Sequence, residues 1–589
     1  MNRWLGLTCG CLLFASAAAA QQAPSAYSTL EQNVISEHLH ARNWQLDPEP
    51  EGKWIEDIQI DTTEVWDQRD PVPDWLNLFH TTTRQHVVRR ELLFAEGDRY
   101  SGLSVAESAR NLRTYPQLSI VLIVTARGSA SDRVRVIVIT KDVWSLRLNW
   151  ELKSADAHLN YLLLNPSEEN LFGEHVTVGA QFALDPATYA VGGSLAQSRI
   201  FGSHVAASLA ANVVKNRDTD VTEGSYGQFY YGQPLYSLDA RWAWGTAFLW
   251  DNEIARRYIG VGVGAFDARV TAVDDRIPET YRADRLYGGY QLERSFGHRF
   301  KFDVSVGAEG LRAIYRTQDL SAFDPAAVAE FGRRFLPVSD QRVSPFVQLH
   351  AHRTDYVSLI EVETLGLQED FRVGHDFAVR VYPASTALGS SRDLIGVQSG
   401  ASYTVPIGDG LIRPVVNSRV EYAAHARNVV TFETDLRVVS PRLGFGRLVL
   451  DGQFLDRPRN YLNAHSLLGG DGRLRGYAFS GFRGANLLAA SAEFRTSSVD
   501  LFSAQVGAAA FYDVAGVADD LNALHMKQGA GLGLRVLFPE FDRIVFRADW
   551  GFPLSPGYAT FPGALYISFK QAFGMPGVVA PEVLSTTLN

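Results

Sequence analysis

The groups best placed for strong polar chemistry are one arginine in a glycine-rich loop and two carboxylates on later strands. The stretch Gly469–Tyr477 reads Gly-Gly-Asp-Gly-Arg-Leu-Arg-Gly-Tyr and presents Arg475. Glu493 and Asp513 each lie in an alternating segment, on the face opposite its apolar row. A guanidinium can bind a carboxylate through two hydrogen bonds. The pattern therefore predicts that Arg475 is held by Asp513 or Glu493.

Other reactive groups follow no catalytic pattern. The sequence has no Gly-x-Ser-x-Gly, no Walker loop and no His-Glu-x-x-His. Its 14 histidines are scattered without a clear metal-ligand spacing, and Cys9 and Cys11 are its only cysteines. Aspartates and arginines that face a lumen are interpreted as channel lining rather than acid–base pairs. We therefore expect no enzyme, no metal and no cofactor.

Segments of alternating apolar and polar residues must position these groups. They include His175–Leu184, Leu238–Trp250 and Ile544–Phe552. Each is about ten residues long with one apolar face, which is typical of a membrane-spanning strand in a barrel. A soluble β-sandwich is the alternative. In a barrel the apolar rows face lipid, so the two carboxylates face the lumen.

We expect an all-β transmembrane barrel of about 16 antiparallel strands over residues 151–573, in the cell outer membrane. More alternating segments can be marked than 16 strands need, and strand boundaries between 255 and 390 stay open. Insertions at about 266–282, 316–341 and 355–375 are predicted as long surface loops. The last strand is expected over Leu565–Phe573, with Phe569 and Phe573 facing lipid. The location of a tail, 574–589, is left open.

Charge and hydropathy limit the partners. The formal net charge of −10 and the sequence pI of about 5.8 argue against nucleic acid, which requires a basic surface. Mean hydropathy is −0.08, and no apolar run of about 18 residues follows the N-terminus. Membrane insertion would then require a closed barrel, because lipid offers no partner to an open sheet edge.

The N-terminus has the features of a secretory signal peptide over residues 1–20. Arg3 is followed by an apolar stretch, Leu5–Phe14, and by the small residues Ala18–Ala20. A polar leader, 21–50, follows, either loosely ordered or forming one short helix.

Residues 51–150 are predicted to form a small periplasmic α/β domain in the order β-α-α-β-β. Its strands are expected at Trp54–Ile60, Ile120–Ala126 and Arg133–Thr140. Both rows of the second strand are apolar. One row would rest on the helices, and the other would meet a partner.

These features resemble the bacterial surface antigen family of outer-membrane protein assembly and translocation factors, to which BamA, TamA and the two-partner secretion transporters belong. Residues 51–150 resemble its POTRA module, and Asn170–Gly173 resembles the turn after its first barrel strand. Gly469–Tyr477 resembles its sixth extracellular loop, with Leu474 in place of valine. Ala492-Glu493-Phe494 and Phe511-Tyr512-Asp513 resemble the strands after that loop.

The resemblance implies a lock of the sixth loop in the lumen. Its members would be Arg475, Gly476, Tyr477, Glu493, Phe511 and Asp513, with loop glycines Gly469 and Gly470. Phe569 and Phe573 would form the terminal strand signal.

The resemblance also implies a function. An assembly factor would take up unfolded outer-membrane protein through its single POTRA domain and insert it at the lipid bilayer. A two-partner secretion transporter that exports one protein, or a passive porin-like channel, is the alternative. A periplasmic or lipoprotein accessory partner is left open.

Overall fold

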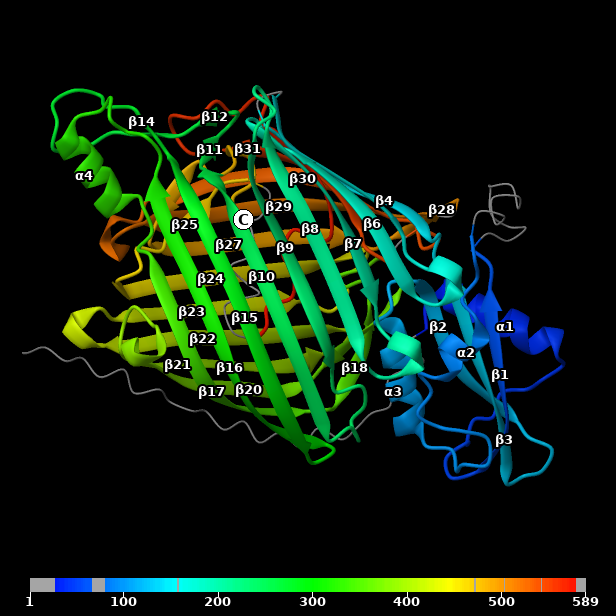
Figure 1. Cartoon of the computed structure of the whole chain (residues 1–589). Helices are drawn as coiled ribbons and strands as arrows, with labels where there is room; N and C mark the ends of the chain where they lie inside the picture. The colour runs from blue at the N-terminus through cyan, green and yellow to red at the C-terminus, as the bar shows by residue number, and fades with distance from the viewer. Residues whose placement is uncertain are drawn as a thin grey trace, which may run out of the picture.

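The chain forms a small α/β domain joined to a closed β-barrel (Figure 1). This computed structural model describes residues 27–65, 80–155, 158–470, 473–502, 504–541 and 543–578. The predicted signal peptide, 1–20, lies outside these residues.

The N-terminal domain is a three-stranded sheet in the order β1-β3-β2. Its strands are β1 (Trp54–Thr63), β2 (Leu118–Arg127) and β3 (Arg133–Asp142). The helices α2 (Gln85–Arg89) and α3 (Gly102–Arg113) pack on one face through Val88, Val105, Ala109 and Leu112. The order of elements is β-α-α-β-β, and β2 is an edge strand of the sheet, as β1 is on the other side.

The second face of this sheet is covered by the leader. Helix α1 (Thr29–Ala41) begins at a capping box between Ser28 and Glu31 and packs on β2 and β3 through Ile35 and Leu39. The apolar row expected to meet a partner is therefore buried by the chain itself. Next to α1, the amide of Asp47 donates to the carbonyl of Thr125 at 3.0 Å, which adds a short piece of the leader to the edge of β2.

The barrel has twenty strands among the described residues, not about sixteen. The surplus alternating segments of the sequence are strands in their own right. In chain order the strands are β4 (Leu146–Ala155), β5 (His158–Glu168), β6 (Val176–Leu184), β7 (Thr188–Gln197), β8 (Ala206–Asn216), β9 (Thr222–Gln233), β10 (Trp242–Arg256), β15 (Thr280–Phe296), β16 (Phe300–Thr317), β17 (Asp340–Arg353), β20 (Gly374–Ala384), β21 (Leu394–Ile407), β22 (Gly410–Ala423), β23 (Val429–Val439), β24 (Gly446–Asn460), β27 (Asn486–Thr496), β29 (Ala504–Ala518), β30 (Lys527–Leu537), β31 (Phe546–Pro553) and β32 (Ala564–Phe569).

Smaller elements lie in the connections. A short strand, β28 (Val499–Leu501), pairs with β29 beside the end of β27. The other elements are β11 (Tyr258–Ile259), β12 (Gly262–Val263), β13 (Ala265–Phe266), β14 (Ile277–Pro278), α4 (Pro325–Arg334), β18 (Tyr356–Ile360), β19 (Gln368–Arg372), β25 (Ser466–Leu468) and β26 (Phe482–Gly484).

We call the barrel end beside the N-terminal domain the domain rim, and the opposite end the far rim. Because the strands run alternately up and down, the segments 257–279, 318–339 and 461–485 are at the far rim. In Figure 1 the far rim carries α4 and β11 to β14. The connection 354–373 is at the domain rim, next to α3.

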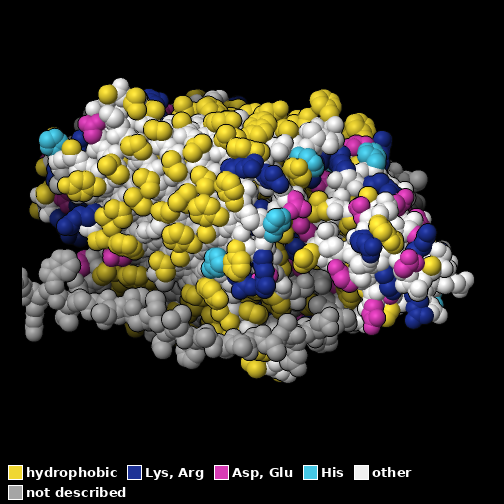
Figure 2. Space-filling view, turned by 90° about the horizontal axis from the view of Figure 1, so that it is seen from below, with side chains coloured by type: hydrophobic (Ala, Val, Ile, Leu, Met, Phe, Trp, Pro, Cys, Tyr) yellow, Lys and Arg dark blue, Asp and Glu magenta, His cyan; other side chains and the backbone are white. Residues whose placement is uncertain are grey.

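The outer wall of the barrel is apolar, and its inner wall is charged. Exposed side chains on the outer wall include Leu209, Phe248, Val306, Val347 and Leu534. Figure 2 shows hydrophobic side chains spread over the barrel, with charged side chains gathered on the N-terminal domain. Inward rows carry buried arginines and carboxylates. No helix among the described residues is long and apolar enough to cross a membrane. The closed barrel with its lipid-compatible wall is an outer-membrane β-barrel.

Candidate functional site in the barrel lumen

The loop that carries Arg475 folds from the far rim into the barrel. Its base is a hairpin in which β25 pairs with β26, and Gly469 and Gly470 begin its tip with φ of 105° and 107°. A Cβ on Gly469 would lie 2.4 Å from the carbonyl oxygen of Ala478, so this turn requires glycine. Asp471 and Gly472 lie outside the described residues. Counted along the chain, this is the eighth loop of the far rim, not the sixth, because two additional strand pairs precede it.

Arg475 is fully buried against the inner wall. Its Nε and its backbone amide donate to Asp513 Oδ2 at 2.8 and 3.0 Å, and Nη2 donates to Asp513 Oδ1 at 2.9 Å. Nη1 donates to Glu493 Oε2 at 2.8 Å. The structure thus places both predicted carboxylates against one guanidinium, in the paired geometry that a buried charge requires.

A third carboxylate, Asp549 of β31, completes this cluster. It was not predicted from the sequence as a partner of Arg475. Nη1 of Arg475 donates to Asp549 Oδ2 at 3.0 Å, and Arg535 donates to Oδ1 of the same residue at 2.5 Å. Arg495 also donates to Glu493, and Arg547 donates to Asp549. Four arginines therefore share three carboxylates. The strand pattern of 544–552 places Asp549 opposite the apolar row, which was the available signal.

Aromatic residues and a glycine shape the rest of the lock. The guanidinium carbon of Arg475 lies 3.4 Å from the ring centre of Phe511. Gly476 has a φ of 102°, and a Cβ there would lie 2.7 Å from the backbone of Phe552. The hydroxyl of Tyr477 donates to the carbonyl of Gln528 at 2.6 Å. Tyr566 of β32 donates to the carbonyl of Tyr477 at 2.7 Å, so the loop reaches the last strand.

The terminal strand is shorter than predicted, and Phe573 does not face lipid. β32 ends at Phe569, whose ring packs against Trp150 of β4 with the two ring centres 5.8 Å apart. An extended strand would have placed Gln571 on the lipid side, where an amide has no partner. The chain instead turns inward, Gln571 accepts a hydrogen bond from Arg535, and Phe573 packs beneath Arg475 with its ring centre 5.3 Å from the guanidinium carbon.

The tail continues inside the barrel as far as it is described. The carbonyls of Phe573 and Gly574 accept hydrogen bonds from Arg437 at 3.0 and 2.9 Å. Further along, the carbonyl of Gly577 accepts one from Asn417 at 3.3 Å. Residues 574–578 therefore cross the lumen from the seam toward β22.

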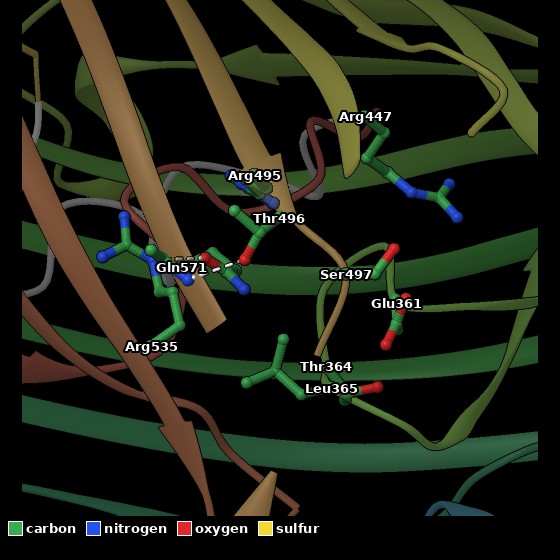
Figure 3. Close-up of a pocket in the computed structure, with 10 residues that line it drawn as sticks. Glu361, Thr364, Leu365, Arg447, Arg495, Thr496, Ser497, Arg535 and Gln571 are labelled. Carbon is green, nitrogen blue, oxygen red and sulfur yellow. Dashed lines mark hydrogen bonds between the residues drawn. The ribbon is translucent and has the colours of Figure 1, made fainter. Parts of the chain in front are cut away.

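The predicted surface loop near 355–375 also enters the lumen, as the hairpin of β18 and β19. Its turn packs Leu359 and Val362 against inward residues of β22, β23 and β24. Glu363 pairs with Arg437 at 3.0 Å. Figure 3 shows Thr364 and Leu365 of this turn beneath Arg495 and Arg535 of the wall and Gln571, which follows the last strand. Apolar residues in the turn, Leu359, Val362, Leu365 and Leu367, explain why it is buried.

The N-terminal domain docks directly on the domain rim. The side chain of Asn170, in the turn after β5, donates to Thr81 O and Thr83 Oγ1, both at 3.0 Å. Arg199, in the turn after β7, donates to Glu91 at 2.7 Å. The amide of Leu238 donates to Glu107 of α3 at 2.6 Å. Three rim turns thus fix the domain beside the opening of the barrel.

Ser491 also belongs to this cluster, because its hydroxyl donates to Asp513 Oδ1 at 2.7 Å and accepts from Arg475 at 3.3 Å. The described residues of the site therefore form a network of ion pairs that fixes an inward loop to the last five strands of an outer-membrane barrel.

No family model and no curated protein matches this sequence. Solved structures with a similar fold include CdiB from Acinetobacter baumannii, at 12% identity over 88% of this chain and 74% of that chain, with a TM-score of 0.43. CdiB from Escherichia coli matches at 12% identity over 92% and 83%, with a TM-score of 0.41. BamA from Haemophilus ducreyi lacking POTRA domains 1-3 matches at 12% identity over 93% and 94%, with a TM-score of 0.33. CdiB and BamA are outer-membrane barrels of the Omp85 family.

Proposed function

We propose that this protein is an outer-membrane protein assembly or translocation factor. Its N-terminal domain, 51–150, would be a periplasmic POTRA-like module that receives unfolded protein, and the barrel would insert that protein into the outer membrane at its seam. The bilayer and an unfolded client are then its partners, and the domain rim is where a periplasmic accessory protein would bind.

The observation that carries this proposal is the weak seam of the barrel. Within the described part of the seam, β32 and β4 pair at two positions, Tyr566↔Lys153 and Ile567↔Leu152. By contrast, β29 and β30 pair from Gln505↔Leu537 to Ala515↔Lys527. Opening the seam breaks few backbone hydrogen bonds and exposes two strand edges to the bilayer, where a client strand can pair with them.

The lock supports this proposal because it stabilises the wall beside the seam. Arg475 joins β27, β29 and β31 through Glu493, Asp513 and Asp549, and Tyr566 joins the same loop to β32. The last strands can then hold their shape while β32 separates from β4.

Client uptake at β2 would begin with displacement of residues 45–47 of the leader from the edge of this strand. Backbone hydrogen bonds on the edge of β2 near Thr125 and Arg127 are made by residues 45–47 of the leader. A client strand that adds along the whole of β2 must remove this segment first.

Export through the lumen is the second candidate. Twenty strands enclose a wider lumen than sixteen, which favours passage of a chain. This route requires the β18–β19 hairpin, the Arg475 loop and residues 574–578 to leave the lumen.

A disulfide across the seam separates the two candidates. Leu152 and Ile567 are register partners, so L152C/I567C can form a cross-link. The matched control is L534C/A548C, which joins β30 to β31 inside the wall. In cells depleted of the native protein, we expect the oxidised seam variant to lose outer-membrane protein assembly, a reductant to restore it, and the control to keep it. Full assembly by the oxidised seam variant would exclude lateral insertion.

A further inference from the structure

Two histidines and an aspartate gather at the domain-rim end of the inner wall, away from the lock. Asp303 of β16 lies in register with His350 of β17, and His352 follows on the same face of that strand. The two imidazole rings stack with their centres 4.5 Å apart. Asp303 and His352 are buried, with exposed fractions of 2% and 8%.

The distances in this cluster are too long for hydrogen bonds. Asp303 Oδ2 lies 3.5 Å from His350 Nδ1 and 3.6 Å from His352 Nδ1, whereas an N–H···O bond spans about 2.7–3.2 Å. Zinc bonds nitrogen and oxygen at about 2.0–2.2 Å, so two ligand atoms of a tetrahedral site lie about 3.3–3.6 Å apart. All three ligand atoms lie within 4.8 Å of one another.

Unused polar atoms face the same space. His352 Nδ1 is buried and has no hydrogen-bond partner among the described residues. Asp303 Oδ1 is also buried without a close partner there, although the Ser295 hydroxyl of the paired strand lies beside this carboxylate. The nearest cations are engaged elsewhere: Lys301 donates to the carbonyl of Leu238 at 2.6 Å, and Arg372 pairs with Asp376. An unpartnered buried imidazole nitrogen beside a buried carboxylate is unfavourable unless a proton or a metal cation joins them, and their separation of 3.6 Å fits a shared metal better than an N–H···O bond.

The second ring nitrogen of His350 is already oriented. His350 Nε2 lies 2.8 Å from Asp376 Oδ1, which favours the tautomer with its proton on Nε2 and a lone pair on Nδ1. A carboxylate behind a histidine in this way is the usual support of a metal ligand.

The cluster also has a route for entry. His352 lines a cavity of about 410 Å³ between α3 and the domain rim, together with Glu107, Tyr236 and Asp370. An ion and one water ligand can therefore reach the site from the side of the N-terminal domain.

We propose that Asp303, His350 and His352 bind a zinc ion, with Asp376 orienting His350 and a water molecule in the fourth position. The sequence was interpreted as having no metal site. The pair His350-x-His352 could have predicted the site. Residues two apart share one face when the segment is a strand, so both imidazoles lie on the same side of β17.

The test is a zinc titration of the full chain, purified without a polyhistidine tag and shown to be folded by its heat-modifiable migration. We expect one zinc ion per chain, and cobalt(II) in its place should give the visible absorption of a four-coordinate site with nitrogen and oxygen ligands. H352Q and D303N should each weaken binding by at least about 100-fold, and D376N by about 10- to 100-fold. H525Q, in an exposed loop of the far rim, should bind as the wild type does.

The proposal is overturned if folded wild-type protein binds no zinc at one equivalent, or if H352Q or D303N binds it equally well. Should either variant lose the folded band, the other and the wild-type stoichiometry decide. This outcome is independent of the seam experiment, which measures assembly and not metal.

Discussion

Two buried arginines at the inner wall have similar surroundings, but one belongs to a wall strand and the other to a loop. Arg475 contacts three carboxylates and lies over Phe511. Arg342 of β17 donates to Glu421 at 3.0 Å and Glu309 at 2.9 Å, and lies 4.5 Å from the ring centre of Tyr382. Arg342 belongs to a strand that is already paired with β16 and β20. Arg475 belongs to a loop.

Whether the arginine belongs to a strand or to a loop determines which part of the structure its ion pairs stabilise. Strand ladders on both sides fix Arg342, so its ion pairs stabilise a wall that is already in place. The inward position of the Arg475 loop depends mainly on side-chain contacts, because the backbone pairing described in it is limited to the short β25–β26 hairpin and the bridge Gly470↔Leu474. Similar chemistry thus stabilises the wall in one region and holds an inward loop in the other.

The largest effect is expected from R475A. Removing one partner of a buried ion pair costs about 3–5 kcal/mol, and Asp513 would lose the two hydrogen bonds that the guanidinium donates, while the backbone amide of residue 475 stays. We expect a lower unfolding midpoint in denaturant and cleavage of the 461–485 loop by protease added from outside the cell. R473A is the control, because Arg473 is partly exposed and pairs with Asp451. Equal protease resistance of R475A and wild type would contradict the loop-holding role.

R342A should destabilise the barrel without releasing a loop. Glu421 keeps Arg392 at 2.8 Å and Arg419 at 2.6 Å, so we expect a smaller loss of about 2–3 kcal/mol. Denaturant unfolding measures the loss, and the protease assay should leave segment 461–485 uncut. Cleavage there in R342A would show that the two clusters act as one.

The smallest effect is expected in the N-terminal domain, where D61N should loosen α1. Burial opposes ionisation of Asp61, but the hydrogen bond to His38 and the charge of Arg42 hold its pKa below the ordinary 3.8. Because this pKa is lowered on folding, its stabilisation is present above about pH 4 and is lost as the pH falls further.

Hydrogen exchange of residues 29–41 at pH 7 should rise in D61N by the equivalent of about 1 kcal/mol. D132N, in an exposed turn, is the control, and equal exchange in D61N and wild type would mean that apolar packing alone holds the helix. Lowering the pH of the wild type below about 4 should bring its α1 to the level of D61N.

Alternation along strands was enough to predict the barrel and the inward faces of Glu493 and Asp513, because side-chain direction depends only on local backbone geometry. It could not show that Asp549 reaches Arg475, since that depends on how β29, β30 and β31 are staggered. About 16 strands were expected, although more alternating segments can be marked in the sequence, and the surplus segments are strands of the barrel.

Two other misses concern the chain end and the leader. The row of outward apolar residues predicted up to Phe573 is interrupted by Gln571. Because the Gln571 amide has no partner in lipid, the chain turns into the lumen before this residue. The sequence predicted that one apolar row of β2 would meet a partner. It could not show that α1 covers this row, because that contact joins segments about 85 residues apart.

The inward course of residues 574–578 links distant parts of the ring. The side chains that bind them, Arg437 and Asn417, belong to β23 and β22, whereas the residues themselves follow the last strand, β32. This segment therefore acts as an internal strut between the last strand and the opposite wall. Extra residues inserted between Phe573 and Val578 would disturb the strut, so a reporter or affinity handle is better placed in an exposed loop of the far rim.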